Sequence, residues 1–333
     1  LALADALDKT SARDLGPLPV LFSRVSTATD DEELAVALTA GIVEELDGPR
    51  TYLHHILGER YDQRRVDAFL AHAPAMVQFH LDHTALKFVD GNLVPDFHGN
   101  TPGARSGGRS VCAAPFDAAR LGPALLKQLR PPRDIYAFLG MSIGGDLRHF
   151  MRANRALDSF VYVARRILRH GVDLLTHGQG RQRMGGNALV AALLATAREQ
   201  GVTLLARHAA RELLTANGHI TGAMVDTPIG PRGILARRGV VLACGFFPHD
   251  MARKAQLFLH APTGQEHWSA APESNTGDGL RLGESVGAQL DTSIADPGAG
   301  APVSLVPRPG GGVAAFAHLA ERGMLGLSAD DAS

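Results

Sequence analysis

The sequence contains few cysteines: only Cys112 and Cys244 occur in 333 residues. Two are too few for a disulfide framework or a cysteine-rich metal site. The count fits a reducing compartment, and we expect a cytoplasmic location. An excess of charge is also missing, because 33 Lys and Arg nearly cancel 34 Asp and Glu. That balance gives no global field to attract nucleic acid or acidic lipid, and no nucleic-acid partner is expected. We interpret the densest local basic cluster, at 165–170, as a solvated helix face.

Long hydrophobic runs are absent as well. No apolar stretch approaches the roughly 20 residues that a membrane-spanning helix needs, so no membrane span is predicted. The first 14 residues lack a basic region followed by an apolar core, which argues against a signal peptide. Because the chain does not begin with Met, we expect a fragment or a processed form.

The 15 histidines form no H-E-x-x-H pattern. His80 and His83 can share the face of a predicted helix, with His72 nearby. A zinc site would need a third ligand and a carboxylate as well. We therefore predict no metal site.

The residues that are present indicate a globular protein, with 45% apolar and 20% charged side chains. The length suffices for one large domain or two ordinary ones. Hydrophobic periodicity and capping residues predict helices in the first half of the chain, and turn-forming residues predict loops over 84–134. The predicted helices span 29–46, 48–61, 62–83 and 155–176.

From residue 183 onward, helix and strand patterns alternate. A helix is predicted at 187–200 and a short strand at 202–206. Asn217-Gly218 between two apolar runs is a strong hairpin signal. The apolar run from Val240 to Phe247 is typical of a fully buried strand in a parallel sheet. This half of the chain therefore predicts an α/β architecture.

Three glycine-containing segments could bring backbone against a ligand. Gly185 and Gly186 precede a helix, whose free N–H groups favour anionic groups, although the pair also suits a tight turn. Cys244 and Gly245 follow the predicted buried strand, where open α/β sheets bind ligands; a crowded strand end is the alternative. The run S-N-T-G-D-G at 274–279 directly precedes a helix predicted to begin at residue 280, which favours a ligand loop over an ordinary capped helix.

The order and spacing of these segments resemble a flavoprotein family. That family contains fumarate reductase and succinate dehydrogenase flavoprotein subunits and the 3-ketosteroid dehydrogenases. The resemblance rests on G-G-N-A-L-V-A-A-L-L, R-R-G-V-V-L-A-C-G-F-F-P-H-D and N-T-G-D-G, and it covers roughly residues 40–310. The earlier stretches 52–80 and 95–117 resemble its ketosteroid dehydrogenase branch.

The resemblance implies FAD as the cofactor and an α/β fold, a Rossmann-like FAD-binding domain with a large helical insertion. It implies an oxidoreductase that transfers a hydride at a C–C bond next to a carbonyl, on a small steroid-like or enone substrate. No catalytic residue can be carried over, because none of the four tyrosines lies in a matching motif. The implied cofactor contacts are Gly185, Gly186, Ala210, Ala243, Cys244, Gly245, Asn275, Thr276, Gly277 and Asp278.

Departures from the family pattern set the expected domain limits. No G-x-G-x-x-G occurs near the N-terminus, so we expect residues 1–39 to be an irregular remnant of the N-terminal FAD segment. Residues 40–182 would form the helical and loop-rich insertion, 183–290 the continuation of the FAD-binding domain, and 291–333 the start of an incomplete substrate-capping domain. Phe246 replaces a glycine where the family's backbone lies close to the cofactor. The resemblance therefore implies a truncated flavoprotein.

A different enzyme class is indicated by G-M-S-I-G at 140–144, the nucleophile-elbow pattern of serine hydrolases. Ser142 would be the nucleophile of an esterase. Nine histidines follow it, so the supply of triad partners decides nothing. With 37 glycines chance matches are frequent, and no βαβ series precedes residue 137 to build the sheet that an elbow needs. A third alternative is a non-catalytic flavoprotein-like remnant.

Overall fold

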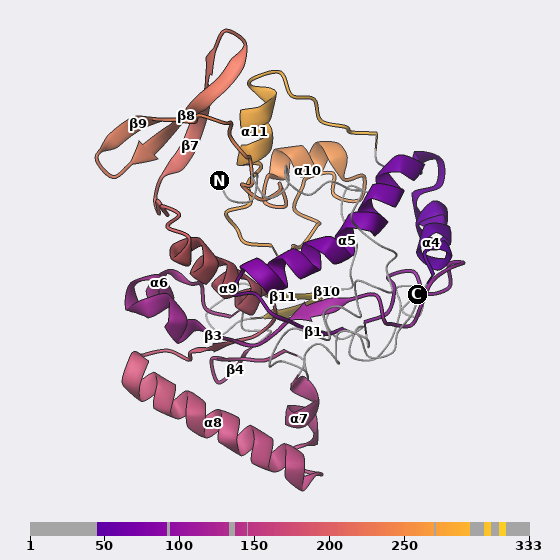
Figure 1. Ribbon diagram of the computed structural model, residues 1–333, viewed down its shortest axis with the longest axis vertical. Helices are drawn as coiled ribbons and strands as arrows, with labels where there is room; N and C mark the ends of the chain where they lie inside the picture. The colour runs from indigo at the N-terminus through magenta and orange to yellow at the C-terminus, as the bar shows by residue number, and fades with distance from the viewer. Residues whose placement is uncertain are drawn as a thin grey trace. The chain divides into compact units, whose positions relative to one another are not determined.

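The structure is a computed structural model that describes residues 45–91, 94–132, 137–144, 146–269, 271–293, 303–307 and 313–317 (Figure 1). The remnant expected at 1–39 and nearly all of the helix predicted at 29–46 lie outside these residues. The chain divides into two compact units, and the boundary between them falls between Val202 and Thr203.

The first unit combines long helices with very short strands. The predicted helices at 48–61, 62–83, 155–176 and 187–200 are all confirmed, with small shifts at their ends. Its elements are α4 (Asp47–Leu57), η1 (Gly58–Arg60), α5 (Gln63–His83), β1 (Phe88–Asp90), β2 (Val111–Ala113), β3 (Phe116–Asp117), η2 (Ala118–Leu121), α6 (Gly122–Gln128), β4 (Ala137–Phe138), β5 (Met141–Ser142), α7 (Leu147–Arg152), α8 (Leu157–His177), β6 (Gln182–Arg183) and α9 (Gly185–Glu199).

Helix α9 is the centre of the core of the first unit. Four alanines recur at helical spacing along one side of α9 and are at most 2% exposed: Ala188, Ala191, Ala192 and Ala195. Because an alanine side is flat, neighbouring segments approach the helix closely. Leu86, Phe88, Phe116 and Leu121 pack in the same buried cluster. Small residues on one helix side thus let α9 serve as the axis around which the short strands pack.

A side-chain hydrogen bond fixes the end of α5 against α9. The backbone N–H of Ala85 donates to Oγ1 of Thr196 at 2.9 Å, and the Thr196 hydroxyl in turn donates to the Ala192 carbonyl at 3.0 Å. At the other end of α5, the Asp62 carboxylate caps the helix by accepting from the N–H groups of Arg64 and Arg65. Both ends of α5 are therefore held by polar contacts, a local one at Asp62 and a long-range one to Thr196.

The second unit is built on a three-stranded antiparallel sheet in the order β7-β8-β9. The predicted hairpin is confirmed: Asn217 and Gly218 join β7 to β8 with φ angles of 51° and 78°, the conformation that this pair adopts readily. The elements of the unit are β7 (Ala209–Ala216), β8 (His219–Thr227), β9 (Gly230–Leu235), α10 (Met251–Leu257), α11 (Asp278–Glu284), β10 (Val303–Pro307) and β11 (Val313–Ala317).

Two strands predicted from apolar runs are not formed. The stretches 202–206 and 240–246 have no regular secondary structure. Val202 in the first stretch is 51% exposed. Val241 in the second stretch is 88% exposed, although the sequence predicted a buried strand there. A strand of a parallel sheet is buried only when neighbouring strands and helices cover it. Every strand pair among the described residues is antiparallel, so neither stretch has such neighbours there.

The second unit contains a small aromatic core. Phe247 and Phe258 are 2% and 5% exposed, with ring centroids 5.8 Å apart, and Ala261 is fully buried beside them. Leu257 of α10 and Leu280 of α11 pack against this cluster. The cluster thereby positions the loops that precede both helices.

Candidate functional site

Two loops that are distant in sequence lie hydrogen-bonded to each other in the second unit. The Gly277 N–H donates to the Phe246 carbonyl at 3.1 Å, and the His249 N–H donates to the Asn275 carbonyl at 3.1 Å. The segment at 243–246 is exposed to solvent. The structure therefore brings two of the three predicted glycine segments together.

Glycine is required at the contact between these loops. Gly245 has φ of +81°, and a Cβ atom there would lie 2.6 Å from Oδ1 of Asn275. Gly277, with φ of +78°, precedes α11, and a Cβ on Gly279 would meet Cβ of Cys244 at 3.4 Å. Left-handed backbone and close approach together explain why glycines occur at both loops.

Arg281 closes the loop that leads into α11. Its Nη1 donates to the Thr276 carbonyl at 2.6 Å and lies 3.3 Å from Oδ2 of Asp250, while its Nη2 pairs with Asp278. The Thr276 hydroxyl donates to Oδ1 of Asp278 at 3.3 Å. The polar side chains of this loop thus hold one another in place.

A second arginine braces the helices that follow the loops. Arg253 of α10 donates through both Nη atoms to the Glu284 carboxylate of α11, each at 2.8 Å. This pair is bidentate, the strongest geometry for a guanidinium and a carboxylate. The hydrogen bond from Arg253 lowers the pKa of Glu284. The first turn of α10 is therefore linked to the last residue of α11.

A cavity of about 230 Å³ opens beside these loops. Its lining includes Ala210 and Asp278, two of the predicted contacts, and it also includes Arg211, Arg281, Leu282 and Ser285. The sequence prediction missed the two arginines, although each lies within three residues of a predicted contact. Arg211 also bonds Asp226 at 2.5 Å, and that hydrogen bond raises the pKa of Arg211. The cavity is thus bordered by two guanidinium groups and a carboxylate.

Gly185 and Gly186 lie in the first unit, apart from the eight other predicted contacts. Gly185 has φ of +53°, and a Cβ at either position would meet open space. The helix α9 that they begin has no side-chain cap at Met184. An uncapped helix start with open space before it suits an anionic group, as the sequence indicated.

Ser142 does not have the geometry of a hydrolase nucleophile. It lies in β5, half of a two-residue antiparallel pair with β4, and is 3% exposed. An elbow presents its hydroxyl at the exposed end of a strand. Here Oγ accepts a hydrogen bond from the Met184 N–H at 3.2 Å, and the carbonyl accepts from Nη2 of Arg166 at 2.8 Å. Gly140 lies in the turn that joins β4 to β5.

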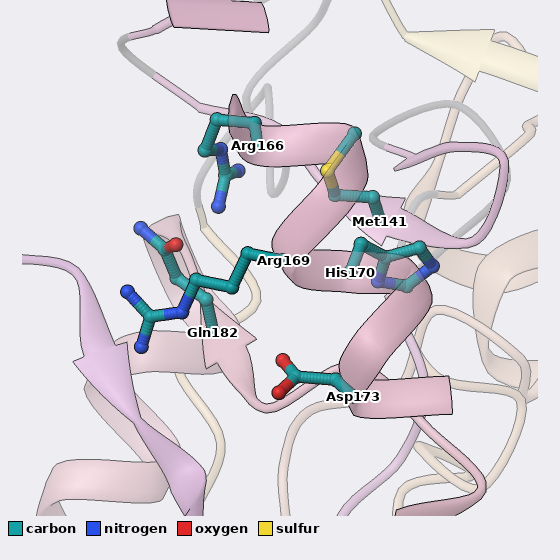
Figure 2. A pocket seen from close by; sticks show the side chains of 6 residues that line it. All are labelled: Met141, Arg166, Arg169, His170, Asp173 and Gln182. Carbon is teal, nitrogen blue, oxygen red and sulfur yellow. The ribbon is translucent and has the colours of Figure 1, made fainter. Parts of the chain in front are cut away.

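The cavity lined by Met141, the residue before Ser142, is also too small for a substrate. It measures about 10 Å³, which holds one water molecule at most. Figure 2 shows the side chains around it, largely from α8: Met141, Arg166, Arg169, His170, Asp173 and Gln182. The nearby His170 has another hydrogen-bond partner, because its Nε2 lies 3.1 Å from the Leu139 carbonyl oxygen. The prediction of a serine hydrolase is therefore not supported by this site.

The described part of the chain contains neither a cluster of metal-ligating side chains nor a membrane-spanning helix. No three His, Cys, Asp or Glu side chains gather there in a way that could hold a metal ion. None of the helices that the structure describes has both the length and the hydropathy needed to cross a bilayer.

Comparison with known proteins identifies the family. The model of the FAD binding domain family matches residues 33–332. The chain belongs to this FAD-binding family. The resemblance drawn from the glycine segments is thereby confirmed, and FAD is confirmed as the family's cofactor.

The relatives of this FAD-binding chain include dehydrogenases of oxo compounds. It is 30% identical over 325 residues to a 4-oxocyclohex-2-ene-1-carboxylate 5-dehydrogenase from Sinomonas cyclohexanicum, covering 97% of this chain and 52% of the relative. It is 35% identical over 259 residues to a 3-oxosteroid 1-dehydrogenase from Mycolicibacterium smegmatis, covering 75% and 44%. The chain thus spans about half the length of the curated relatives it matches.

A solved structure supports the fold assignment. The 3-ketosteroid delta1-dehydrogenase from Sterolibacterium denitrificans, in complex with 1,4-androstadiene-3,17-dione, matches with a TM-score of 0.70 and 28% identity. The match covers 83% of this chain and 49% of that one. The chain therefore has the FAD-binding flavoenzyme fold of mixed helices and strands.

The residues of the second unit fit one end of an FAD molecule. Pockets that enclose a ligand are typically about 300–1,000 Å³, so a cavity of about 230 Å³ can take only part of a dinucleotide. Its two arginines suit phosphate or an electron-rich ring, and the exposed backbone at 243–246 allows close approach. Phe246 does not fill this space. Its side chain is 53% exposed, and the centroid of its ring lies 4.6 Å from that of Phe247.

Proposed function

We propose that this chain is part of an FAD-dependent dehydrogenase that acts on a C–C bond next to a carbonyl. The observation that carries the proposal is the contact between the 243–246 segment and the 275–279 loop beside a cavity lined by Arg211 and Arg281. The family and the oxo-compound dehydrogenases among its relatives support it. A small steroid-like or enone substrate and a cytoplasmic location belong to the same proposal.

The proposed fold is Rossmann-like, with residues 183–290 continuing the FAD-binding domain and 40–182 forming its insertion. Residues 1–39 would then be the remnant of the N-terminal FAD segment, and 291–333 the start of a substrate-capping domain. What supports this arrangement is the composition of the apolar stretch from Val240, which suits a buried strand, although the stretch is not paired in a sheet among the described residues.

In the proposed site, bound FAD would supply the hydride-accepting group for the reaction. Gly245 and Gly277 would let the two loops pack closely beside the cofactor, because Gly245 lies against the side chain of Asn275 and Gly277 against that of Asp250. Arg211 and Arg281 would offset the negative charge of a phosphate, and Asp278 would accept a hydrogen bond from a hydroxyl group. Gly185 and Gly186 would contribute free N–H groups at the start of α9. These chain residues therefore bind and orient; none is assigned a proton-transfer role.

The experiment that tests this proposal is an FAD titration of the purified chain. We expect a flavin absorbance band near roughly 450 nm to remain with the protein after desalting, as flavin chemistry requires. A ligand that binds only the native state must raise stability, by about 2.7 kcal/mol at 100 times its Kd. The melting temperature should therefore rise with FAD concentration. A cooperative melting transition that FAD leaves unchanged would show instead that the chain is a non-catalytic remnant.

A matched pair of variants connects binding to the proposed residues. Arg211→Gln with Arg281→Gln removes both guanidinium groups from the cavity, whereas Arg237→Gln with Arg238→Gln removes two charges from an exposed stretch of the same unit. We expect the first pair to weaken FAD binding by at least about tenfold, since each charge-assisted hydrogen bond contributes about 1.5–3 kcal/mol. An equal loss of FAD affinity in both double variants would count against the proposed site.

A further inference from the structure

Helix α8 turns polar side chains toward its own unit and apolar side chains toward solvent. Ser159, Arg166, His170 and Asp173 are its buried residues. A helix on the surface of a globular protein normally shows the reverse arrangement. The large apolar side chains of α8 that are more than half exposed, here called the α8 stripe, are Leu157 (78%), Phe160 (57%), Val161 (56%), Leu168 (71%), Val172 (51%) and Leu175 (90%).

The reversed orientation of α8 is fixed by specific contacts of its polar side. Arg166 lies 3.2 Å from Asp146, with the two side chains only 8% and 7% exposed. Nδ1 of His149 on α7 lies 3.2 Å from Oγ of Ser159, and the Asp173 carboxylate accepts from the Arg181 N–H at 3.0 Å. Rotating the helix to hide the α8 stripe would break all three contacts, so the stripe is a built feature of the surface.

The surroundings of the α8 stripe are strongly basic. Residues 147–177 carry five exposed arginines but only one exposed acid, Asp158. The whole chain, by contrast, has a formal net charge of −1. Arg165 borders the stripe, because it follows Val161 by four residues and precedes Leu168 by three. The interpretation of 165–170 as a solvated face is right for Arg165 and Arg169 but wrong for Arg166 and His170, which are buried. The exposed arginines are Arg148, Arg152, Arg155, Arg165 and Arg169, of which Arg169 lies 3.7 Å from the Asp117 carboxylate.

We propose that α8 docks the protein on an anionic lipid surface, with its axis parallel to the membrane plane. An apolar stripe with Arg165 at its border and further arginines just before the helix resembles helices at the lipid–water interface, whose apolar side chains enter the acyl boundary while cations meet lipid phosphates. The opposite side of α8 is occupied by the buried polar contacts of its own unit. The helix therefore lies on the bilayer and does not cross it.

A second copy of the chain suits the α8 stripe less well than lipid. A helix of 21 residues is about 32 Å long and about 10 Å wide, which gives the stripe roughly 300 Å². Specific protein interfaces bury about 800 Å² on each partner and require complementary shape. A bilayer needs no matching shape and is attracted by the positive charge that would repel a second α8.

The test is co-sedimentation of the purified chain with vesicles. We expect binding to phosphatidylcholine vesicles that contain about one quarter phosphatidylglycerol, and little binding to pure phosphatidylcholine. Binding should fall as salt is raised from about 0.1 M to about 0.5 M, because ions screen the arginines. Arg155→Gln with Arg165→Gln should weaken binding about fivefold per arginine.

A charge placed in the stripe tests the apolar part. Leu168→Glu with Leu175→Glu should weaken vesicle binding by at least about tenfold, whereas Ile229→Glu, an exposed apolar position on the second unit, should leave it unchanged. Leu168→Ser with Leu175→Ser repeats the test without added charge, and circular dichroism checks that each variant folds.

Two results would overturn the proposal. One is the absence of sedimentation with either vesicle, or sedimentation that the Leu168 and Leu175 variants leave unchanged. The other is a dimer, measured by light scattering, that dissociates in those variants, because the stripe would then be an interface between two copies.

Discussion

Gly245 is a residue at which backbone conformation and space both require glycine. Any L-residue with a φ near +81° is strained by about 1–2 kcal/mol, and a Cβ would also collide with Asn275 Oδ1 at 2.6 Å. We expect Gly245→Ala to lower the free energy of unfolding by more than the strain alone, measured by urea denaturation.

Gly287 supplies the matched control for this substitution. It also has a positive φ, of +93°, but a Cβ there would meet no atom within 4 Å. Gly287→Ala therefore carries the conformational strain without the collision. Equal losses in the two variants would show that the 245–275 contact does not constrain the site.

His267 gives the second unit a predictable dependence on pH. Burial, together with the positive charges of Lys254 and His260, lowers the pKa of His267 below its ordinary 6.5. Its Nδ1 lies 3.0 Å from Nε2 of His260, a hydrogen bond that needs one neutral ring. As the pH falls below the unfolded-state pKa, His267 takes up a proton in the unfolded chain while it is still neutral in the folded chain, so the free energy of unfolding decreases. Above the unfolded-state pKa, the neutral ring contributes its full stabilisation to the folded chain.

Denaturation series at several pH values check this expectation. Between about pH 7.5 and about pH 5.5 the unfolding free energy should decrease, and His267→Gln should reduce that slope. His219→Gln changes an exposed histidine next to the β7–β8 turn and should leave the slope as it is. A slope that is the same in all three proteins would contradict the assignment to His267.

At the scale of elements, α7 and α8 depend on one buried charge pair. Asp146 accepts hydrogen bonds from the Gly144 N–H at 2.9 Å and the Tyr162 hydroxyl at 3.1 Å, besides its ion pair with Arg166. Removing one partner of a buried pair typically costs about 3–5 kcal/mol, because the other charge stays buried without compensation. We expect Arg166→Met to destabilise the chain by that amount in thermal or urea denaturation.

The neighbouring Arg165 is the control for the charge pair. Arg165→Met removes the same group one position away, where the side chain is exposed, and should change stability by less than about 0.5 kcal/mol. The double variant Asp146→Asn with Arg166→Met should lose less unfolding free energy than Arg166→Met alone, because neither group of the buried pair then carries a charge. A double variant that loses as much as the two single variants added together would argue against coupling between the two groups.

The accuracy of the sequence predictions depended on how local the signal was. Asn217-Gly218 predicts its hairpin because two residues contain the whole conformational requirement. The segment from Val240 was predicted as buried because its composition suits a sheet interior, but burial depends on distant strands that no local pattern supplies. The inverted burial of α8 was missed for a similar reason: periodicity reveals an apolar stripe, and tertiary contacts such as Arg166–Asp146 decide which way it faces.

At the scale of the molecule, the predicted cofactor contacts fall on both compact units. Ala210, Cys244 and Asp278 lie in the second unit, where Ala210 and Asp278 share one cavity, whereas Gly185 lies in the first. Order along the chain and a resemblance to a family predict these residues as contacts. The arginines that border the cavity were found only in three dimensions, since neither Arg211 nor Arg281 belongs to a motif.

The two cysteines provide one test of the proposed site in the intact chain. Both are exposed, Cys244 beside Gly245 in the second unit and Cys112 on β2 in the first. If FAD binds along the 243–246 segment, it covers Cys244 and leaves Cys112 reactive. At an FAD concentration ten times the Kd, we expect modification of Cys244 by a thiol reagent to slow about elevenfold, which is the ratio of total to ligand-free protein. Cys112→Ser and Cys244→Ser assign each rate, and equal slowing of both thiols, or of neither, would place FAD elsewhere.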